Sequence, residues 1–229
     1  HNSLITSIAK MDKTPLKMFE LAVSLIDTDN PPKDQTVYLS KRELFAFFKV
    51  TDHDKHSRFK EAIEKMQKQA FFQIKKEQDK GFKFVSIVPI PYVEWTDYHD
   101  EVLIRFSPEI MPYLINLKTN FTQHALSEIS ELNSKYAVVL YRWLSMNYNQ
   151  YEHYSVKGGR REEQVESYRN PTMSMRDLRE MTDTVKDYQR IYNFEKRVLK
   201  AGLDEINAHT SFSVTYEKIK KGRSIDSIV

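Results

Sequence analysis

The sequence predicts an α+β protein built from two copies of one unit, each a group of helices followed by a β-hairpin. A Ser-x-x-acid motif occurs twice, at Ser40 to Glu43 and at Ser174 to Asp177. An apolar stripe at helical spacing follows each motif, and two short strands around a polar turn follow each stripe. With 229 residues, of which 40% are hydrophobic and 29% charged, the chain is long enough for two packed domains.

The two copies correspond position by position. Each Ser-x-x-acid motif is a capping box, in which the serine side chain takes an unpaired helix N–H and the acid reaches back to the serine N–H. One extra residue enters the second copy after the motif. The matched pairs are Ser40 and Ser174, Arg42 and Arg176, Glu43 and Asp177, Leu44 and Leu178, Val50 and Val185, Asp52 and Asp187, Lys55 and Arg190, Phe59 and Phe194, and Ile63 and Val198.

In the first copy, Thr14 is a good N-cap and Pro15 suits the first helical position. Alternation and turn residues mark the strands. The expected elements are a helix at 14–26, a strand at 37–39, a short helix from the capping box, a longer helix with the stripe His56, Phe59, Ile63, Met66 and Ala70, and strands at 71–76 and 82–89 around a turn at 77–81.

The second copy repeats this order. Gly158-Gly159 and mixed charges mark a loop at 152–171 that is long enough to be mobile. The expected elements are a helix at 134–149, a strand at 172–175, a short helix from the capping box, a longer helix with the stripe Ile191, Phe194, Val198, Gly202 and Ile206, and strands at 212–218 and 224–229 around the turn Lys220 to Arg223.

Between the copies we expect a strand at 101–106 and a helix at 108–117, followed by a short connection near 118–123. We place the domain boundary in that connection. The predicted domains are therefore 1–120 and 121–229.

The order helix, strand, helix, helix, hairpin is that of a winged helix-turn-helix. Such a unit presents one face of its second helix to the DNA major groove, so the residues opposite the apolar stripe are candidate base readers. The turn of the hairpin, with four basic and no acidic residues at 218–223, would lie along phosphates. The candidate residues of the second copy are Arg190, Tyr192, Asn193, Lys196, Arg197 and Lys200 on the helix and Lys218, Lys220, Lys221 and Arg223 on the wing.

We expect the first copy to read bases more weakly than the second. Its second helix mixes basic and acidic residues on the outward face, and its expected wing alternates Lys75, Lys76, Lys80 and Lys83 with Glu77 and Asp79. The candidate DNA-binding residues of this copy are Lys55, Ser57, Arg58 and Lys65.

Enzymatic chemistry is not expected. The chain has no cysteine and no G-x-x-x-x-G-K-[ST] loop. His53 and His56 have no third ligand at a recognisable spacing, so we expect no metal, cofactor or catalytic residue, and a buried, hydrogen-bonded His56 at the position of Ile191. No uncharged stretch is long enough for a membrane helix, and the absence of cysteine fits the cytoplasm, where we expect the protein to act.

The stretches that carry a family resemblance are Ile5 to Met11, Asn133 to Tyr136, Tyr141 to Leu144, Glu205 to Asn207 and Ile219 to Arg223. These stretches resemble the RepB-type replication initiators of theta-replicating, lactococcal-type plasmids, and the similarity covers essentially all of the chain. The wider family is similar to the RepE and RepA initiators, which have two winged-helix domains and no known catalytic activity.

The resemblance implies origin binding. Monomers of this family bind directly repeated iterons, and dimers bind an inverted operator repeat and repress the initiator's own gene. It also implies a dimer contact in the first domain and host initiator and helicase machinery as partners. The DNA contacts would come from the region of Lys55 and Arg58, from Arg190 to Lys200 and from the wing at Lys220 to Arg223.

Two alternatives stay open on the sequence. A dimeric winged-helix transcription repressor without a role in initiation would use the same helices. A protein-interaction module that uses winged helices as docking surfaces would show little DNA affinity.

Overall fold

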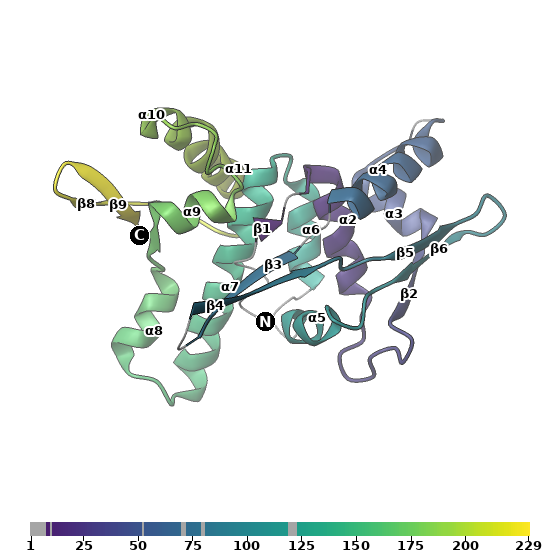
Figure 1. Ribbon diagram of the computed structural model, residues 1–229, viewed down its shortest axis with the longest axis horizontal. Helices are drawn as coiled ribbons and strands as arrows, with labels where there is room; N and C mark the ends of the chain where they lie inside the picture. Colours follow the sequence, from purple (N-terminus) through teal and green to yellow (C-terminus); the bar gives the residue numbers. More distant parts are fainter. Residues whose placement is uncertain (1–7, 10, 52, 70–71, 79–80, 119–122) are drawn as a thin grey trace. The chain divides into compact units, whose positions relative to one another are not determined.

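The computed structural model describes residues 8–9, 11–51, 53–69, 72–78, 81–118 and 123–229, which form two compact units divided between Glu131 and Leu132 (Figure 1). Each unit combines helices with antiparallel three-stranded sheets. The predicted α+β architecture with two units is confirmed. None of the described helices is long and apolar enough to cross a membrane.

The first unit contains a helix or strand at each place where its sequence predicts one. Three of its elements, β1, β5 and α6, are additional to the expected ones. The elements are β1 (Ile8–Ala9), α2 (Lys13–Ser24), β2 (Thr36–Ser40), α3 (Lys41–Phe48), α4 (Lys55–Gln69), β3 (Phe72–Gln78), β4 (Gly81–Ile87), β5 (Tyr92–Trp95), β6 (Glu101–Arg105), α5 (Met111–Lys118) and α6 (Gln123–Glu131).

Helix α2 lies at the centre of the first unit's core. Leu16 and Phe19 are fully buried, and the ring of Phe19 lies 4.9 Å from that of Phe72. Helices α4, α5 and α6 all pack on α2. The helix begins at Lys13 with Asp12 as its N-cap, so the expected cap at Thr14 is wrong.

Helix α6 moves the division between the units. It packs on α2 and α3, Ile129 is fully buried, and the Lys17 ammonium donates to the Ser130 carbonyl at 2.7 Å. The structure therefore divides at 131/132, and not at the predicted 120/121. The predicted connection itself lies largely at 119–122, which are outside the described residues, as are Asp52 and Ala70.

The second unit follows the expected order, with one correction. The segment 152–171, predicted as a loop, is a helical hairpin: α7 continues to Lys157, two glycines with positive φ end it, and α8 returns along it. Glu162 to Arg169 is rich in good helix formers, which the loop prediction undervalued. The elements are α7 (Lys135–Lys157), α8 (Glu162–Arg169), β7 (Met173–Ser174), α9 (Met175–Met181), α10 (Ile191–Phe194), η1 (Glu195–Lys200), α11 (Ala201–His209), β8 (Lys218–Lys221) and β9 (Ser224–Ile228).

Both capping motifs cap helices. The hydroxyls of Ser40 and Ser174 accept from the N–H groups of Glu43 and Asp177, each at 3.0 Å, at the starts of α3 and α9. The acids depart from the expected box, because each carboxylate accepts from the serine hydroxyl, at 2.9 and 2.7 Å, instead of reaching the serine N–H.

The second helix of the second unit contains a π-helical turn, η1, between α10 and α11. In the first unit the apolar stripe is Phe59, Ile63 and Met66. In the second unit it is Phe194, Val198 and Gly202, and the distance along the sequence from its first to its last residue is one position greater. A π turn accommodates one residue more than an α turn. The insertion therefore leaves Phe194, Val198 and Gly202 all buried on one side of the helix.

Candidate nucleic-acid interface

Strand pairing identifies the wing of each unit. In the second unit the sheet order is β7-β9-β8, so the strand ahead of the first helix of the helix-turn-helix pairs with the last strand of the terminal hairpin. The first unit has the same order, β2-β6-β5. By topology, β5 and β6 correspond to β8 and β9, and β5–β6 is the wing of the first unit.

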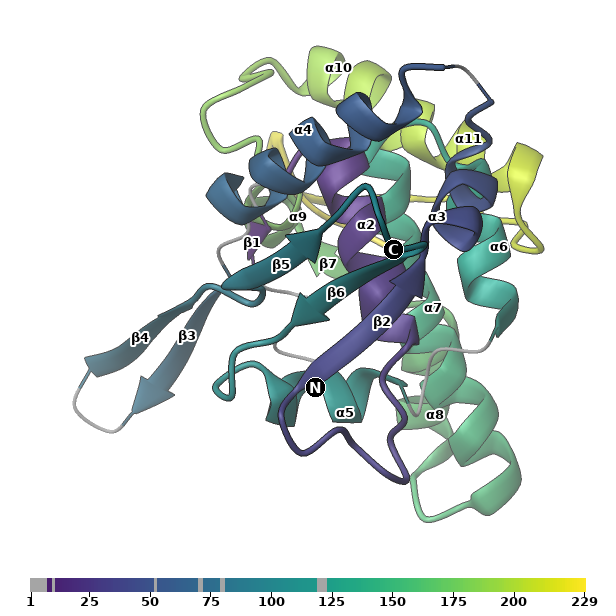
Figure 2. The same cartoon turned by 90° about the vertical axis from the view of Figure 1, so that its right-hand side faces the viewer.

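The wing predicted for the first unit, 71–89, is therefore wrong. Strands β3 and β4 form a separate hairpin with β1 instead of pairing with β2 (Figure 2). They lie between the second helix and the true wing in the sequence. A strand prediction from local pattern cannot show which hairpin β2 pairs with, because that pairing links distant residues.

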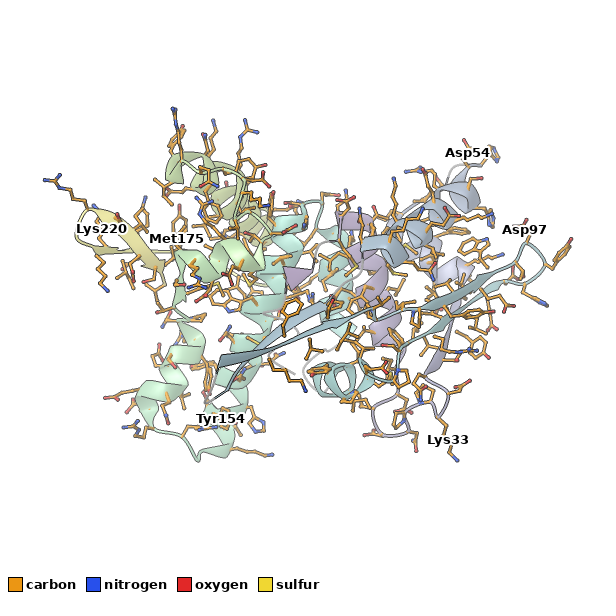
Figure 3. The ribbon with its side chains drawn as sticks, in the orientation of Figure 1. Lys33, Asp54, Asp97, Tyr154, Met175 and Lys220 are labelled. Carbon is orange, nitrogen blue, oxygen red and sulfur yellow. The ribbon has the colours of Figure 1, made fainter. Side chains whose placement is uncertain are left out.

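The two wings differ in charge. The turn of the first-unit wing contains Asp97 and Asp100 and no lysine or arginine, and Tyr98 at its centre is 94% exposed. The second-unit wing holds Lys220, Lys221 and Arg223, all exposed, around Gly222 with φ of +65°. Figure 3 labels Asp97 on the first of these wings and Lys220 on the second. Only the second has the charge that suits phosphates.

The second helix of the second unit separates an apolar and a polar face. Phe194, Val198 and Leu199 are buried. All six residues predicted as readers on this helix are exposed on it or at its N-cap: Arg190, Tyr192, Asn193, Lys196, Arg197 and Lys200. The tertiary structure thus keeps the whole set accessible.

Two of the predicted DNA-binding lysines are engaged within the chain. The Lys218 ammonium lies 2.8 Å from Glu195 Oε1, and the Lys200 ammonium lies 2.6 Å from Asp204 Oδ2. Glu195 Oε1 also accepts from the Tyr216 hydroxyl at 2.6 Å. Hydrogen bonds from Lys218 and then Tyr216 lower the pKa of Glu195, while burial and the bond to Glu195 raise the pKa of Tyr216 to about 12.

The first unit presents a smaller set. Ser57, Arg58 and Lys65 are exposed on α4. Lys55 is the first residue of α4, and its side chain is outside the described part of the structure.

The expectation of a buried His56 is wrong. The His56 side chain is exposed and makes edge-on ring contacts with Phe45 and Trp95, at 5.0 and 6.0 Å between ring centroids. Its counterpart Ile191 is also exposed, by 40%. Both positions lie in the first turn of their helix, ahead of the point where Phe59 and Phe194 enter the core.

The turn of the second helix-turn-helix depends on Arg179, which the sequence analysis did not single out. The Arg179 guanidinium donates to the carbonyls of Tyr188 at 2.9 Å and Asp187 at 3.0 Å, and it lies 4.5 Å from the centre of the Phe194 ring. The first unit has Phe45 at the corresponding position, so comparing the copies offered no signal.

Glu205 and Asn207 connect distant segments of the second unit. Glu205 accepts from the N–H groups of Asn133 and Ser134, ahead of α7. The Asn207 side chain forms two hydrogen bonds with the backbone of Val214, at 2.6 and 2.9 Å, in the segment that leads to β8. Two of the stretches that carry the family resemblance thus meet in space.

Several solved structures are similar to this chain. The crystal structure of Pi initiator protein in complex with iteron DNA matches with a TM-score of 0.71 at 17% identity, over 99% of this chain and 92% of that one. Domains 2 and 3 of RctB match with a TM-score of 0.49 at 10% identity, over 94% of this chain and 80% of that one. The first of these likenesses shows that the two-unit fold is shared.

Two family descriptions cover most of the sequence. "Initiator Replication protein, WH1" matches residues 1–145, and "Initiator Rep protein, WH2" matches residues 174–229. Residues 146–173, which hold most of the helical hairpin, lie between the two matches. The two winged-helix domains predicted from the sequence are confirmed, and the chain belongs to the initiator replication protein family.

Proposed function

We propose that this protein initiates plasmid replication by binding repeated iteron sequences in double-stranded DNA, with its second unit as the main reading domain. The observation that carries the proposal is the exposed face with Asn193, Lys196 and Arg197, next in the same unit to a basic wing. Arginine and lysine can donate to guanine O6 and N7, and asparagine can pair with adenine N6 and N7. The Pi initiator, which shares this fold, was solved with iteron DNA.

The residues of the helix and those of the wing have separate roles in this proposal. The helix reads base edges in the major groove, and Lys220, Lys221 and Arg223 contact phosphates, which fixes the register without selecting sequence. The first unit contributes Lys55, Ser57, Arg58 and Lys65 from α4 in a second groove. Because the turn of the first-unit wing is acidic, we assign no phosphate contact to that wing. Two successive grooves give a footprint of about 20 base pairs.

We propose further properties on the basis of the family resemblance. The protein would exist as monomers that bind iterons and as dimers that bind an inverted operator repeat and repress its own gene, with the dimer contact in the first unit. Occupied repeats would bend the adjacent DNA so that it opens, and deformable steps would lower the cost. Host initiator and helicase proteins would then be recruited, in the cytoplasm.

A binding experiment tests the DNA-reading proposal. Affinity for the plasmid's own origin repeats and for random duplex is measured by gel shift between 50 and 200 mM salt. Six to ten phosphate contacts would give a loss of roughly 10³ to 10⁵ in affinity over this range. Arg197→Ala should cost about 1–3 kcal/mol on the origin repeat and relax discrimination at one base pair, whereas Lys221→Ala should weaken all sequences about equally.

Lys157→Ala is the matched control, because Lys157 is exposed but lies at the end of α7, away from the helix-turn-helix in the sequence. It should leave both affinities unchanged. A flat salt response of the unmodified protein would reject DNA binding, and equal losses for Arg197→Ala and Lys221→Ala on both duplexes would show that the roles are assigned wrongly.

The role in initiation is tested separately from DNA binding. A plasmid that lacks its own copy of the gene is supplied with the protein from an unrelated promoter, together with the Arg197→Ala variant as a control. An initiator is required for the plasmid to be maintained, and the variant should fail. A plasmid that persists without the protein would make it a repressor only.

A further inference from the structure

We infer that Glu195 is a positioning residue for DNA recognition. Together with Tyr216 and Lys218 it forms a cluster, here called the strut, that fixes the wing relative to the reading helix, which is the continuous helix α10-η1-α11. Lys218 then belongs to the strut and does not contact phosphate. The inference rests on the DNA-binding function proposed above. It separates one wing lysine from its neighbours and assigns it a different role.

The geometry of the strut links two elements that DNA would contact. Glu195 is the first residue of the π turn in the reading helix, and Lys218 is the first residue of β8. Tyr216 and Lys218 both donate to the same oxygen, Glu195 Oε1, at 2.6 and 2.8 Å. The Glu195 side chain is only 25% exposed, so these charge-assisted bonds are partly shielded from water.

Backbone pairing with β7 restrains β9, whereas β8 is the edge strand of the sheet. From the end of α11 at His209 to β8 the chain has no regular structure, and the side chain of Asn207 holds it at Val214. Beyond Val214, the strut is the side-chain tie between β8 and the reading helix in the described part of the unit. A wing held in one position makes its phosphate contacts only when the helix is in register with its bases.

The other three wing residues differ from Lys218. Lys220, Lys221 and Arg223 are exposed near the turn, whereas the Lys218 charge is neutralised by Glu195. A phosphate contact by Lys218 would also bring its partner Glu195, a negative charge, close to the DNA backbone. Lys218 therefore contributes position and not phosphate affinity.

The sequence of the first unit supports a role specific to the second. The position that corresponds to Glu195 is Lys60, one residue after Phe59 as Glu195 is one residue after Phe194, and Lys60 is exposed. At this position, a carboxylate is therefore present only in the unit whose wing is basic. This pairing of an acid with a basic wing is the arrangement that a strut requires.

The test compares Lys218→Met with Lys220→Met, two neighbours of the same type on one strand. Two quantities are measured for the full chain. The first is the salt slope, which is the magnitude of the slope of log K against the logarithm of the salt concentration, and the second is the ratio of the affinity for the origin repeat to that for random duplex. Lys220→Met should reduce the salt slope by about 0.9, the value for one phosphate contact, and leave the ratio unchanged. Lys218→Met should leave the slope unchanged and lower the ratio by about tenfold, as for one lost hydrogen bond to a charged group.

Two more variants guard against misfolding and against a pure charge effect. Tyr216→Phe removes one bond of the strut without a change in charge, and it should also lower the ratio at constant slope. Glu195→Gln releases the Lys218 charge and should steepen the slope by about 0.9, an effect that disappears in the Lys218→Met background. Asp226→Asn, which changes the net charge equally at an exposed residue of β9, should not steepen the slope.

The outcomes are distinct. If Lys218→Met lowers the slope as Lys220→Met does, or if Asp226→Asn matches Glu195→Gln, the strut is overturned while DNA binding stands. If the unmodified chain shows no salt-dependent binding, the proposed function fails and the strut fails with it. Thermal unfolding of each variant confirms that the folded protein is being compared.

Discussion

At the scale of single residues, Arg179 shows how one side chain can organise a turn. The segment between α9 and α10 belongs to no helix or strand, and two of its non-glycine residues, Asp183 and Tyr188, have positive φ. The Arg179 guanidinium supplies donors to its carbonyls, and Phe194 supplies a ring face. A guanidinium with five N–H groups is suited to this role.

Arg179→Met should therefore lower the free energy of unfolding by about 2 kcal/mol, because the hydrogen bonds from a charged group are lost while methionine keeps an unbranched apolar side chain at this position. Urea unfolding followed by circular dichroism measures the change. Arg176→Met is the control: Arg176 forms an exposed i,i+4 pair with Glu180, and its loss should cost about 0.5 kcal/mol or less. Equal losses for both variants would contradict the role of Arg179.

At the scale of elements, the π turn and Gly202 belong to one solution of a packing problem. Helix α11 packs against α7, and Gly202 lies at the contact. A Cβ at position 202 would lie 2.8 Å from Leu140 Cδ1, and Leu140 is itself buried. The π turn brings the glycine to this point despite the inserted residue, so both features are needed for the two helices to approach closely.

Gly202→Ala should destabilise the protein by about 1 kcal/mol, because the gain in helix propensity of about 1 kcal/mol is smaller than an overpacking cost of about 1–3 kcal/mol. Leu140→Val opens space at the same contact. The loss in free energy of unfolding for the double variant should be smaller than the sum of the losses for the two single variants, by about 0.5 kcal/mol or more. Strict additivity in denaturant unfolding would show that Leu140 does not limit the approach.

The strand pairings illustrate what an element prediction can miss. The residues of β3, β4 and β6 were expected as strands, and they are strands. Their partners were not determined by local pattern, because β2 pairs with a strand about sixty residues away in the sequence, as Ser40 with Glu101. The change of partner moved the first-unit wing from a hairpin of mixed charge to one whose turn has acidic residues and no lysine or arginine.

At the scale of the whole molecule, α6 decides where the first unit ends. Ile129 is fully buried, Lys17 donates to Ser130, and the Lys49 ammonium lies 2.5 Å from Glu131. These contacts join the end of the unit to α2 and to the C-cap of α3. A fragment that stops at residue 120 would expose apolar surface of α2 and α3.

The fragment 1–131 should unfold cooperatively at a higher temperature than the fragment 1–120. Removing a helix with a fully buried isoleucine and two polar ties costs more than about 3 kcal/mol, the cost of truncating one large core side chain. Thermal unfolding of both fragments, with 1–135 as a length control, measures the difference. Indistinguishable melting curves for 1–120 and 1–131 would show that α6 does not stabilise the first unit.

The sequence by itself determined the duplicated order of elements, the two capped helices and the separation of apolar from basic residues on the second reading helix, because spacing and caps act over a few residues. Only the tertiary structure decided which hairpin is the first wing, which unit holds α6, that His56 stays exposed, and that Lys218 is paired with Glu195. These depend on contacts between segments far apart in the chain, and no local pattern records such contacts.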